Sequence, residues 1–278
     1  MIITDRLADI TLRLERSGSL SPRLDAELIV CRTLAMERHA LITERDRAIT
    51  PEEDEGIESL VARRTLGEPV AYLTGTREFY SLDFSVNRSV LIPRPETELL
   101  VDLAVYYAPR GGEVADIGTG SGAIAVALKR NRGDVRVTAT DISAAALKVA
   151  RANAARLLGT GEIHFVKGDL YEPLRGRYFD LIVSNPPYVS PAEMAHLQRD
   201  LAFEPREALV AEDDGFQVIA RVIEGAPAHL EPGGMLILET GSAHSVRVKE
   251  TGAAHGFEVS VMNDYGGLPR VAVCKIPK

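Results

Sequence analysis

Short apolar runs and helical segments alternate along the chain from about Gly112 to its end. The apolar runs that have the length of strands are residues 113–117, 136–140, 162–166, 179–184, 235–239, 257–262 and 270–276. The clearest helical segments between them are residues 122–130, 143–157 and 215–230. This alternation predicts an α/β fold with a seven-stranded, mostly parallel sheet and helices on both of its faces.

The last two strands are joined differently from the others. Only residues 263–269 separate them, and this gap is too short for the helical crossover that parallel neighbours need. We therefore expect an antiparallel strand at the end of the sheet.

The first part of the chain, residues 1–74, has a helical pattern without strands. Apolar residues recur at intervals of three and four after Ser21 and Pro22, where a proline suits the first helical turn. Thr50 and Glu53 form a capping-box sequence around Pro51, which predicts the start of another helix. We expect a small helical domain over residues 1–74 that recognises the substrate.

A connector is expected over residues 75–95, before an α/β domain over residues 96–278. Its apolar positions predict two short strands in a hairpin, with Asn87 between them: Phe79, Leu82, Phe84, Val86, Val90 and Leu91. Pro95 suits the first turn of the helix that follows and that carries Leu99, Leu100 and Leu103.

Composition and charge narrow the class of protein. The chain is 45% apolar and 26% charged, as is ordinary for a globular protein, and its net charge of −8 provides no overall basic field for a nucleic-acid backbone. The N-terminus lacks a signal-peptide layout and no apolar run approaches ~18 residues, so we expect a cytoplasmic protein without membrane contact. The two cysteines are far apart and the six histidines are scattered, so we expect no metal site.

A glycine-rich loop follows the first strand of the α/β domain and opens a helix. It consists of Asp116, Ile117, Gly118, Thr119, Gly120, Ser121 and Gly122. Glycines in such a loop allow a ligand to approach the backbone closely. Asp141 ends the next strand, where a carboxylate commonly accepts hydrogen bonds from ribose hydroxyls. The loop alone fits NAD as well as S-adenosylmethionine, because Gly118, Gly120 and Ala123 satisfy the G-x-G-x-x-G/A pattern.

Two features favour S-adenosylmethionine over NAD. Asp116 precedes the glycines, where a carboxylate suits the cationic amino end of a methionine better than a pyrophosphate. An antiparallel last strand is also more typical of methyltransferases than of nicotinamide enzymes.

Asp169, at the end of the third strand, is placed to accept a hydrogen bond from an adenine amino group, with Leu170 packing on the ring.

The most specific motif is Asn185-Pro186-Pro187-Tyr188, directly after the apolar run 179–184. The asparagine amide both donates and accepts hydrogen bonds, and the two prolines restrict the backbone beside it. The tyrosine adds a flat face. Because the carboxyl end of the fourth strand faces the cofactor in folds of this kind, the motif is suited to hold a planar nitrogen-bearing group beside the cofactor.

With these motifs the chain resembles the release-factor glutamine methyltransferase family, within the S-adenosylmethionine enzymes that carry an N/D-P-P-Y/F/W motif. The resemblance spans nearly the full length and also rests on residues 79–84 (FYSLDF), 93–98 (PRPETE) and 203–209 (FEPREAL). The chain departs from the family at Ser81, where glycine is frequent, and at Leu170, where an aromatic residue is frequent. The resemblance implies a Rossmann-like class I methyltransferase fold and N5-methylation of the glutamine in the Gly-Gly-Gln loop of peptide-chain release factors.

For this reaction we expect the Asn185 side-chain oxygen and the Pro186 carbonyl to accept the two hydrogens of the glutamine amide and so to orient its nitrogen. Pro187 is expected to hold the backbone and Tyr188 to pack against the glutamine side chain. The expected cofactor contacts are Asp116, Gly118, Thr119, Gly120, Ser121, Gly122, Asp141, Asp169, Leu170 and Asn185.

Other functions fit parts of the same pattern. An adenine-N6 methyltransferase would hold an exocyclic amino group in the same way after base flipping, although the acidic charge and the lack of a basic recognition segment oppose a DNA or RNA substrate. The motifs hardly distinguish a release-factor glutamine methyltransferase from one that acts on a ribosomal protein. From other classes, the alternatives are a nicotinamide oxidoreductase and a non-catalytic nucleotide-binding module. The sequence assigns no role to Arg94, Glu96, Thr97 or residues 203–209. We expect a monomer, because a macromolecular substrate must reach the cleft.

Overall fold

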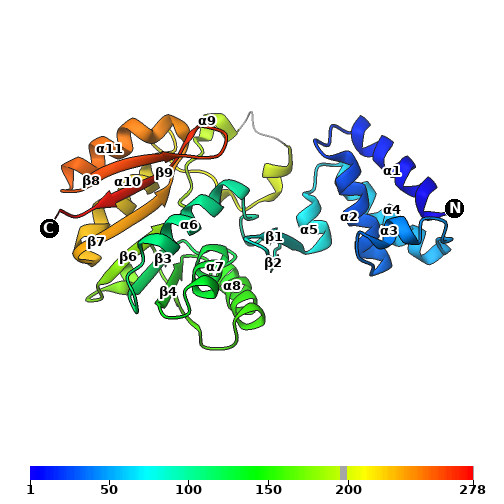
Figure 1. Cartoon of the computed structure of the whole chain (residues 1–278). Coiled ribbons are helices and arrows are strands. Elements are labelled where there is room, and N and C mark those ends of the chain that lie inside the picture. Colours follow the sequence, from blue (N-terminus) through cyan, green and yellow to red (C-terminus); the bar gives the residue numbers. More distant parts are fainter. Residues whose placement is uncertain (195–198, 278) are drawn as a thin grey trace. The chain divides into compact units, whose positions relative to one another are not determined.

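The computed structural model describes residues 1–194 and 199–277 of the chain (Figure 1). These residues form two compact units. The first consists of Met1–Thr76 together with the short segment that ends at Phe203, and the second consists of the other described residues. Among the described residues, no helix is both long and apolar enough to cross a membrane.

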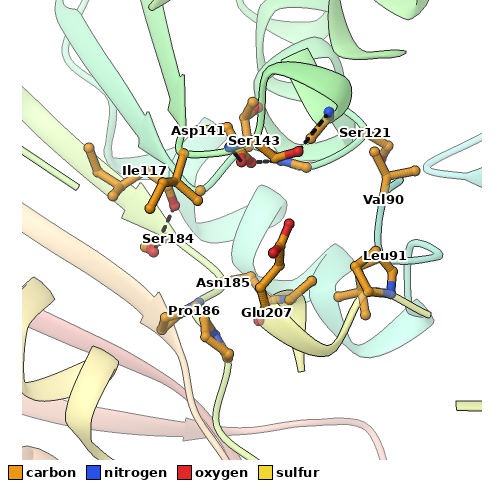
Figure 2. Close-up of a pocket in the computed structure, with 18 of the residues that line it drawn as sticks. Val90, Leu91, Ile117, Ser121, Asp141, Ser143, Ser184, Asn185, Pro186 and Glu207 are labelled. Atoms are coloured by element: carbon orange, nitrogen blue, oxygen red, sulfur yellow. Dashed lines mark hydrogen bonds between the residues drawn. The ribbon is translucent and has the colours of Figure 1, made fainter. Parts of the chain in front are cut away.

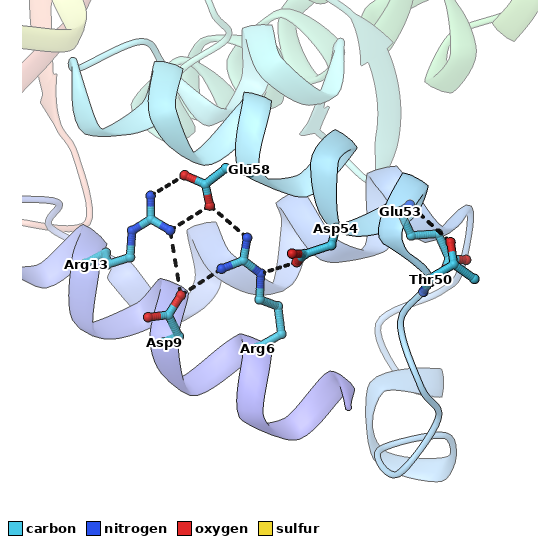
Figure 3. Close-up of polar contacts among 7 residues, drawn as sticks. All are labelled: Arg6, Asp9, Arg13, Thr50, Glu53, Asp54 and Glu58. Carbon is cyan, nitrogen blue, oxygen red and sulfur yellow. Dashed lines mark hydrogen bonds and ion pairs between the residues drawn. The ribbon is translucent and has the colours of Figure 1, made fainter. Parts of the chain in front are cut away.

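The first unit is helical, as the sequence predicts. Its helices are α1 (Ile3–Arg16), α2 (Pro22–Leu34), α3 (Ala40–Thr43), α4 (Pro51–Thr65) and α5 (Val70–Thr74). Apolar residues at intervals of three and four give α1 one buried face, which packs with residues of α2 and α4 such as Ile29 and Ile57. The expected capping box is confirmed: Thr50 Oγ1 accepts from the Glu53 amide at 3.2 Å, and Glu53 Oε2 accepts from the Thr50 amide at 2.9 Å (Figure 3).

A buried arginine joins α1 to α4 (Figure 3). The Arg6 side chain is only 5% exposed, and it pairs with Asp9 at 2.7 Å and with Asp54 and Glu58 at 2.8 Å. Arg13 also pairs with Glu58, and the hydrogen bonds from Arg13 and Arg6 lower the pKa of Glu58 to about 2. Burial of the guanidinium is possible because three carboxylates surround it.

The connector contains a two-stranded sheet, β1 (Thr76–Phe79) and β2 (Leu82–Ser85). The expected hairpin is therefore present, but its turn is not at Asn87, and Val90 and Leu91 are not in a strand. The turn is formed by Tyr80 and Ser81, which have φ angles of 53° and 57°. Positive φ at both central residues matches the right-handed twist of the strands in a two-residue hairpin loop. The usual glycine or asparagine signal is missing there, which is why the pattern placed the turn too late.

The second unit contains a seven-stranded sheet in the order β5-β4-β3-β6-β7-β9-β8. Its strands are β3 (Glu113–Ile117), β4 (Arg136–Asp141), β5 (Ile163–Lys167), β6 (Phe179–Ser184), β7 (Leu230–Glu239), β8 (Glu258–Asn263) and β9 (Pro269–Lys275). The strands β3 to β7 pair in parallel, and β9 is antiparallel to both β7 and β8. The antiparallel strand is confirmed, but it lies between β7 and β8, so that β8 forms the edge.

Helices cover both faces of this sheet (Figure 1). On one face lie α6 (Glu98–Tyr107), α7 (Ala123–Asn131) and α8 (Ala144–Leu157), whose buried residues share a core with Phe79 and Phe84 of the hairpin. On the other face lie α10 (Gln217–Gly225) and α11 (Ser245–Ala254), and a short helix, α9 (Pro191–Met194), follows β6 in the chain. The chain runs outward from β3 through β4 to β5 and then returns to β6 on the other side of β3. Such a reversal opens a crevice at the carboxyl ends of the two central strands.

Candidate active site

A cavity of about 280 Å³ lies at the carboxyl ends of β3, β4 and β6, within the second unit (Figure 2). Most residues expected from the sequence to bind cofactor or substrate line it: Gly118, Thr119, Gly120, Ser121, Asp141, Asp169, Leu170, Asn185, Pro186 and Pro187. Three expected residues do not line it: Asp116, Gly122 and Tyr188. The fold therefore brings together motifs that are up to 70 residues apart in the chain.

The glycine loop presents bare backbone to the cavity. Gly118, Gly120 and Gly122 have φ angles of 75°, 56° and 82°, a region that only glycine adopts readily. A Cβ atom on Gly118 or Gly120 would meet nothing within 4 Å, whereas one on Gly122 would lie 3.1 Å from the Ala150 Cβ atom of α8. The first two glycines thus leave open space for a ligand, and the third allows the loop to pack on a helix.

Asp141 is held in place by the loop that it faces (Figure 2). One carboxylate oxygen accepts a hydrogen bond from the Gly120 amide and the other accepts one from the Ser143 amide, both at 2.8 Å. Burial raises the pKa of Asp141, these two bonds lower it, and the nearby Glu207 raises it again. Each oxygen keeps a lone pair for a ligand hydroxyl.

Asp116 lies beneath the glycine loop and is fully buried. Its Oδ2 atom accepts a hydrogen bond from Thr119 Oγ1 at 2.6 Å. Burial raises the pKa of Asp116 to about 7, against the opposing effect of Thr119 and the Ala125 backbone. The side chain is not among those that line the cavity, and its other oxygen, Oδ1, is buried without a hydrogen-bond partner among the described residues.

The far end of the cavity combines a charged pair with an apolar wall. Asp169 accepts a hydrogen bond from Arg221 of α10 at 2.6 Å. Leu170 has a φ angle of 46° and lines the cavity together with Ile142 and Val218. A left-handed conformation costs a residue other than glycine roughly 1–2 kcal/mol, and such conformations concentrate at functional sites. This end is suited to a flat, largely apolar ring with a polar edge.

The Asn185–Tyr188 motif follows β6 directly, as expected. Asn185 Nδ2 donates to Thr97 Oγ1 at 3.1 Å, and Thr97 Oγ1 donates to Glu239 Oε2 at 2.6 Å. Tyr188 is not among the lining residues of the cavity, and its hydroxyl donates to Glu239 Oε1 at 3.1 Å. Burial raises the pKa values of Tyr188 and Glu239, and the hydrogen bonds from Thr97 and Tyr188 lower that of Glu239. Among the described residues, neither Asn185 Oδ1 nor the Pro186 carbonyl is used in a hydrogen bond.

The second half of the motif is held from behind. His244 Nε2 lies 3.2 Å from the Tyr188 carbonyl oxygen, which requires the hydrogen to be on that ring nitrogen. Gly215, with a φ angle of 84°, approaches the same oxygen so closely that an added Cβ would lie 2.2 Å from it. Val189 then pairs with Val210 in an isolated bridge. The motif is thus a fixed backbone segment.

Two comparisons of sequence agree with this geometry. Family models match residues 95–215 as a methyltransferase small domain and residues 5–75 as a PrmC N-terminal domain. The release factor glutamine methyltransferase of Koribacter versatilis is 42% identical over 95% of this chain and 95% of its own length. The enzyme of that name from Bordetella pertussis is 44% identical over 90% of this chain and 94% of its own length.

The chain belongs to the release factor glutamine methyltransferase family. A solved methyltransferase from Pyrococcus furiosus superposes with a TM-score of 0.55, at 22% identity, over 71% of this chain and 89% of that one, which supports the class I methyltransferase fold.

Sequence reasoning assigned no role to several residues that line or support the site of this family member. Glu239 is a carboxylate at the end of an apolar strand beside β6, and Thr97 lies in the PRPETE stretch, so the sequence marks both positions as candidates for the site. Glu207 lies in FEPREAL and directs its carboxylate into the cavity (Figure 2). That stretch is anchored by Glu204, which accepts from the Ile92 amide at 3.0 Å and pairs with Arg94. Arg221 had no signal, because a single arginine on a helix is usually a surface residue.

Proposed function

We propose that this chain transfers a methyl group from S-adenosylmethionine to the side-chain amide nitrogen (N5) of the glutamine in the Gly-Gly-Gln loop of peptide-chain release factors. The observation that carries the proposal is that Asn185 and Pro186 open into the same cavity as the glycine loop and Asp141. Acceptors for an amide therefore lie beside a nucleoside-binding wall. The names of the relatives support the choice of protein substrate.

The residues of the cavity fit S-adenosylmethionine. The bare loop at Gly118 and Gly120 gives the methionine part access to the backbone, and Asp141 accepts from ribose hydroxyls. Leu170 packs on the adenine ring, and Asp169, whose second oxygen is not used by Arg221, accepts from its amino group. When bound, this cofactor supplies a methyl group already activated by a positively charged sulfur.

The protein contributes orientation more than acid–base chemistry. An amide nitrogen is a weak nucleophile because its lone pair is delocalised into the carbonyl. Asn185 Oδ1 and the Pro186 carbonyl accept the two amide hydrogens, which fixes the nitrogen in the direction of the methyl group and raises its electron density. Pro187 restricts the backbone between these acceptors and Tyr188. Tyr188 is proposed to pack against the glutamine side chain while its hydroxyl donates to Glu239 Oε1.

The helical unit, residues 1–74, is proposed to recognise the release factor, with residues 75–95 as a connector and residues 96–278 as the catalytic domain. The match of residues 5–75 to a PrmC N-terminal domain supports this division. The enzyme is proposed to act in the cytoplasm as a monomer. A net charge of −8 favours a protein over a nucleic acid as its substrate.

The test is to offer purified release factor, ribosomal proteins and nucleic acid separately to the enzyme with cofactor labelled in the methyl group. We expect label only in the release factor, and mass mapping should locate it on the glutamine of the Gly-Gly-Gln loop. Asn185→Ala should abolish turnover and leave binding of S-adenosylhomocysteine nearly unchanged. Label in a ribosomal protein or in adenine, or full activity of Asn185→Ala, would refute the proposal.

A further inference from the structure

A buried chain of hydrogen bonds lies behind the amide of Asn185. It passes from Asn185 Nδ2 to Thr97 Oγ1 at 3.1 Å and from Thr97 Oγ1 to Glu239 Oε2 at 2.6 Å. Thr97 is 4% exposed and Glu239 is 1% exposed, so water does not compete for these contacts. Tyr188 donates to the other carboxylate oxygen at 3.1 Å, which holds Glu239 from a second side.

The direction of this chain is determined by its last member. Both oxygens of Glu239 act as acceptors, one for Tyr188 and the other for Thr97, so the single hydrogen of the Thr97 hydroxyl is donated to Glu239. The Thr97 oxygen is then left with lone pairs only, and the group of Asn185 that faces it must be a donor. The NH₂ group of Asn185 therefore points to Thr97, which leaves Oδ1 of this cavity-lining residue to accept a hydrogen bond from a ligand.

This orientation matters for the proposed reaction, on which the inference rests. A side-chain amide rotated by half a turn would present two hydrogens to the two hydrogens of the substrate amide. We propose that Thr97 and Glu239 are positioning residues, which keep the Asn185 amide in the one orientation that accepts a hydrogen bond from the substrate glutamine. Their hydrogen bonds act on the substrate through Asn185.

The fold explains how three distant segments meet at this point. Ser184 and Leu238 are partners in the parallel pairing of β6 with β7, so the residues that follow them, Asn185 and Glu239, end neighbouring strands at the same level. Thr97 precedes α6, a position where a threonine side chain usually caps the helix, yet here its side chain makes no capping bond. The hydroxyl is used for the chain to Glu239 instead.

The test compares Thr97→Val, which removes the hydroxyl at nearly constant volume, with Thr97→Ser, which retains it. Turnover of release factor and the affinity for S-adenosylhomocysteine are measured for both variants and for the wild type. For Thr97→Val we expect kcat to fall on the order of 10- to 100-fold, with little change in KM for the release factor or in cofactor affinity. Thr97→Ser should retain most of the wild-type kcat.

Thr138→Val is the matched control, because Thr138 is a buried threonine of β4 outside the cavity. It should leave kcat unchanged. If Thr97→Val is poorly folded, Thr97→Ala removes the same hydroxyl without adding a methyl group.

Three results would overturn the inference. The Thr97→Val variant could retain the wild-type kcat, or Thr97→Ser and Thr97→Val could lose kcat equally. The third is that Thr97→Val changes only KM or cofactor affinity. An inactive wild type would instead refute the proposed function.

Discussion

Replacing Asp116 by asparagine should remove a pH-dependent loss of stability that this buried carboxyl imposes on the second unit. Asp116 is fully buried, and burial raises its pKa from 3.8 to about 7 in the folded chain. The unfolded chain releases the proton near the ordinary pKa, whereas the folded chain holds it to a higher pH. The free energy of unfolding should therefore fall as the pH rises from about 4 to about 7 and level off above that range.

The size of the effect follows from the shift in pKa. A shift of roughly 3 units, at ~1.4 kcal/mol for each unit, limits the total loss to about 4 kcal/mol. Between pH 5 and pH 8, roughly 2–3 kcal/mol of this loss is expected. The hydrogen bond from Thr119 is already included in the shift, since it opposes the effect of burial.

The assay is urea unfolding of the wild type and of Asp116→Asn at intervals from pH 5 to pH 8. The difference between the two free energies of unfolding cancels every other titrating group that both proteins share. This difference should change by roughly 2–3 kcal/mol across the range, in the direction that favours the variant at high pH. Asp5→Asn, which removes an exposed carboxyl of α1, is the control for the loss of one acidic side chain. A difference for Asp116→Asn that does not change with pH would refute the reasoning.

Two further predictions concern the backbone that holds the Asn185–Tyr188 motif and the charge of the cavity wall. Gly215→Ala should lower kcat at least tenfold, because a Cβ at that position would lie 2.2 Å from the Tyr188 carbonyl oxygen and the φ angle of 84° is unfavourable for alanine. Steady-state kinetics with release factor measures this effect, and an unchanged kcat would contradict the prediction. Glu207→Gln should weaken binding of S-adenosylmethionine about three- to tenfold more than binding of S-adenosylhomocysteine. The Glu207 carboxylate faces the cavity, and only S-adenosylmethionine carries a charged sulfur (Figure 2). Calorimetric titration of both ligands tests the difference, and equal losses would count against an electrostatic role.

Some expectations succeeded because the signal was local. The capping box at Thr50 and the apolar runs of the parallel strands depend on neighbouring residues only, and they are found where the pattern predicts them. The hairpin turn at Tyr80 and Ser81 was misplaced, because two residues other than glycine adopt positive φ there. The core contacts of Phe79 and Phe84 accompany this conformation, and they are not visible in the local sequence.

By itself, the sequence determined the alternating α/β pattern, the glycine loop and the motif at Asn185, because each depends on residue types at short spacing. Only the tertiary structure decided that Asp116 is buried beneath the loop, that β9 lies inside the sheet, and that Thr97 and Glu239 meet behind Asn185. The order of strands in a sheet and the depth of a side chain depend on contacts between segments far apart in the chain. Thr97 and Glu239 are 142 residues apart, and no local pattern encodes the distance between their side chains.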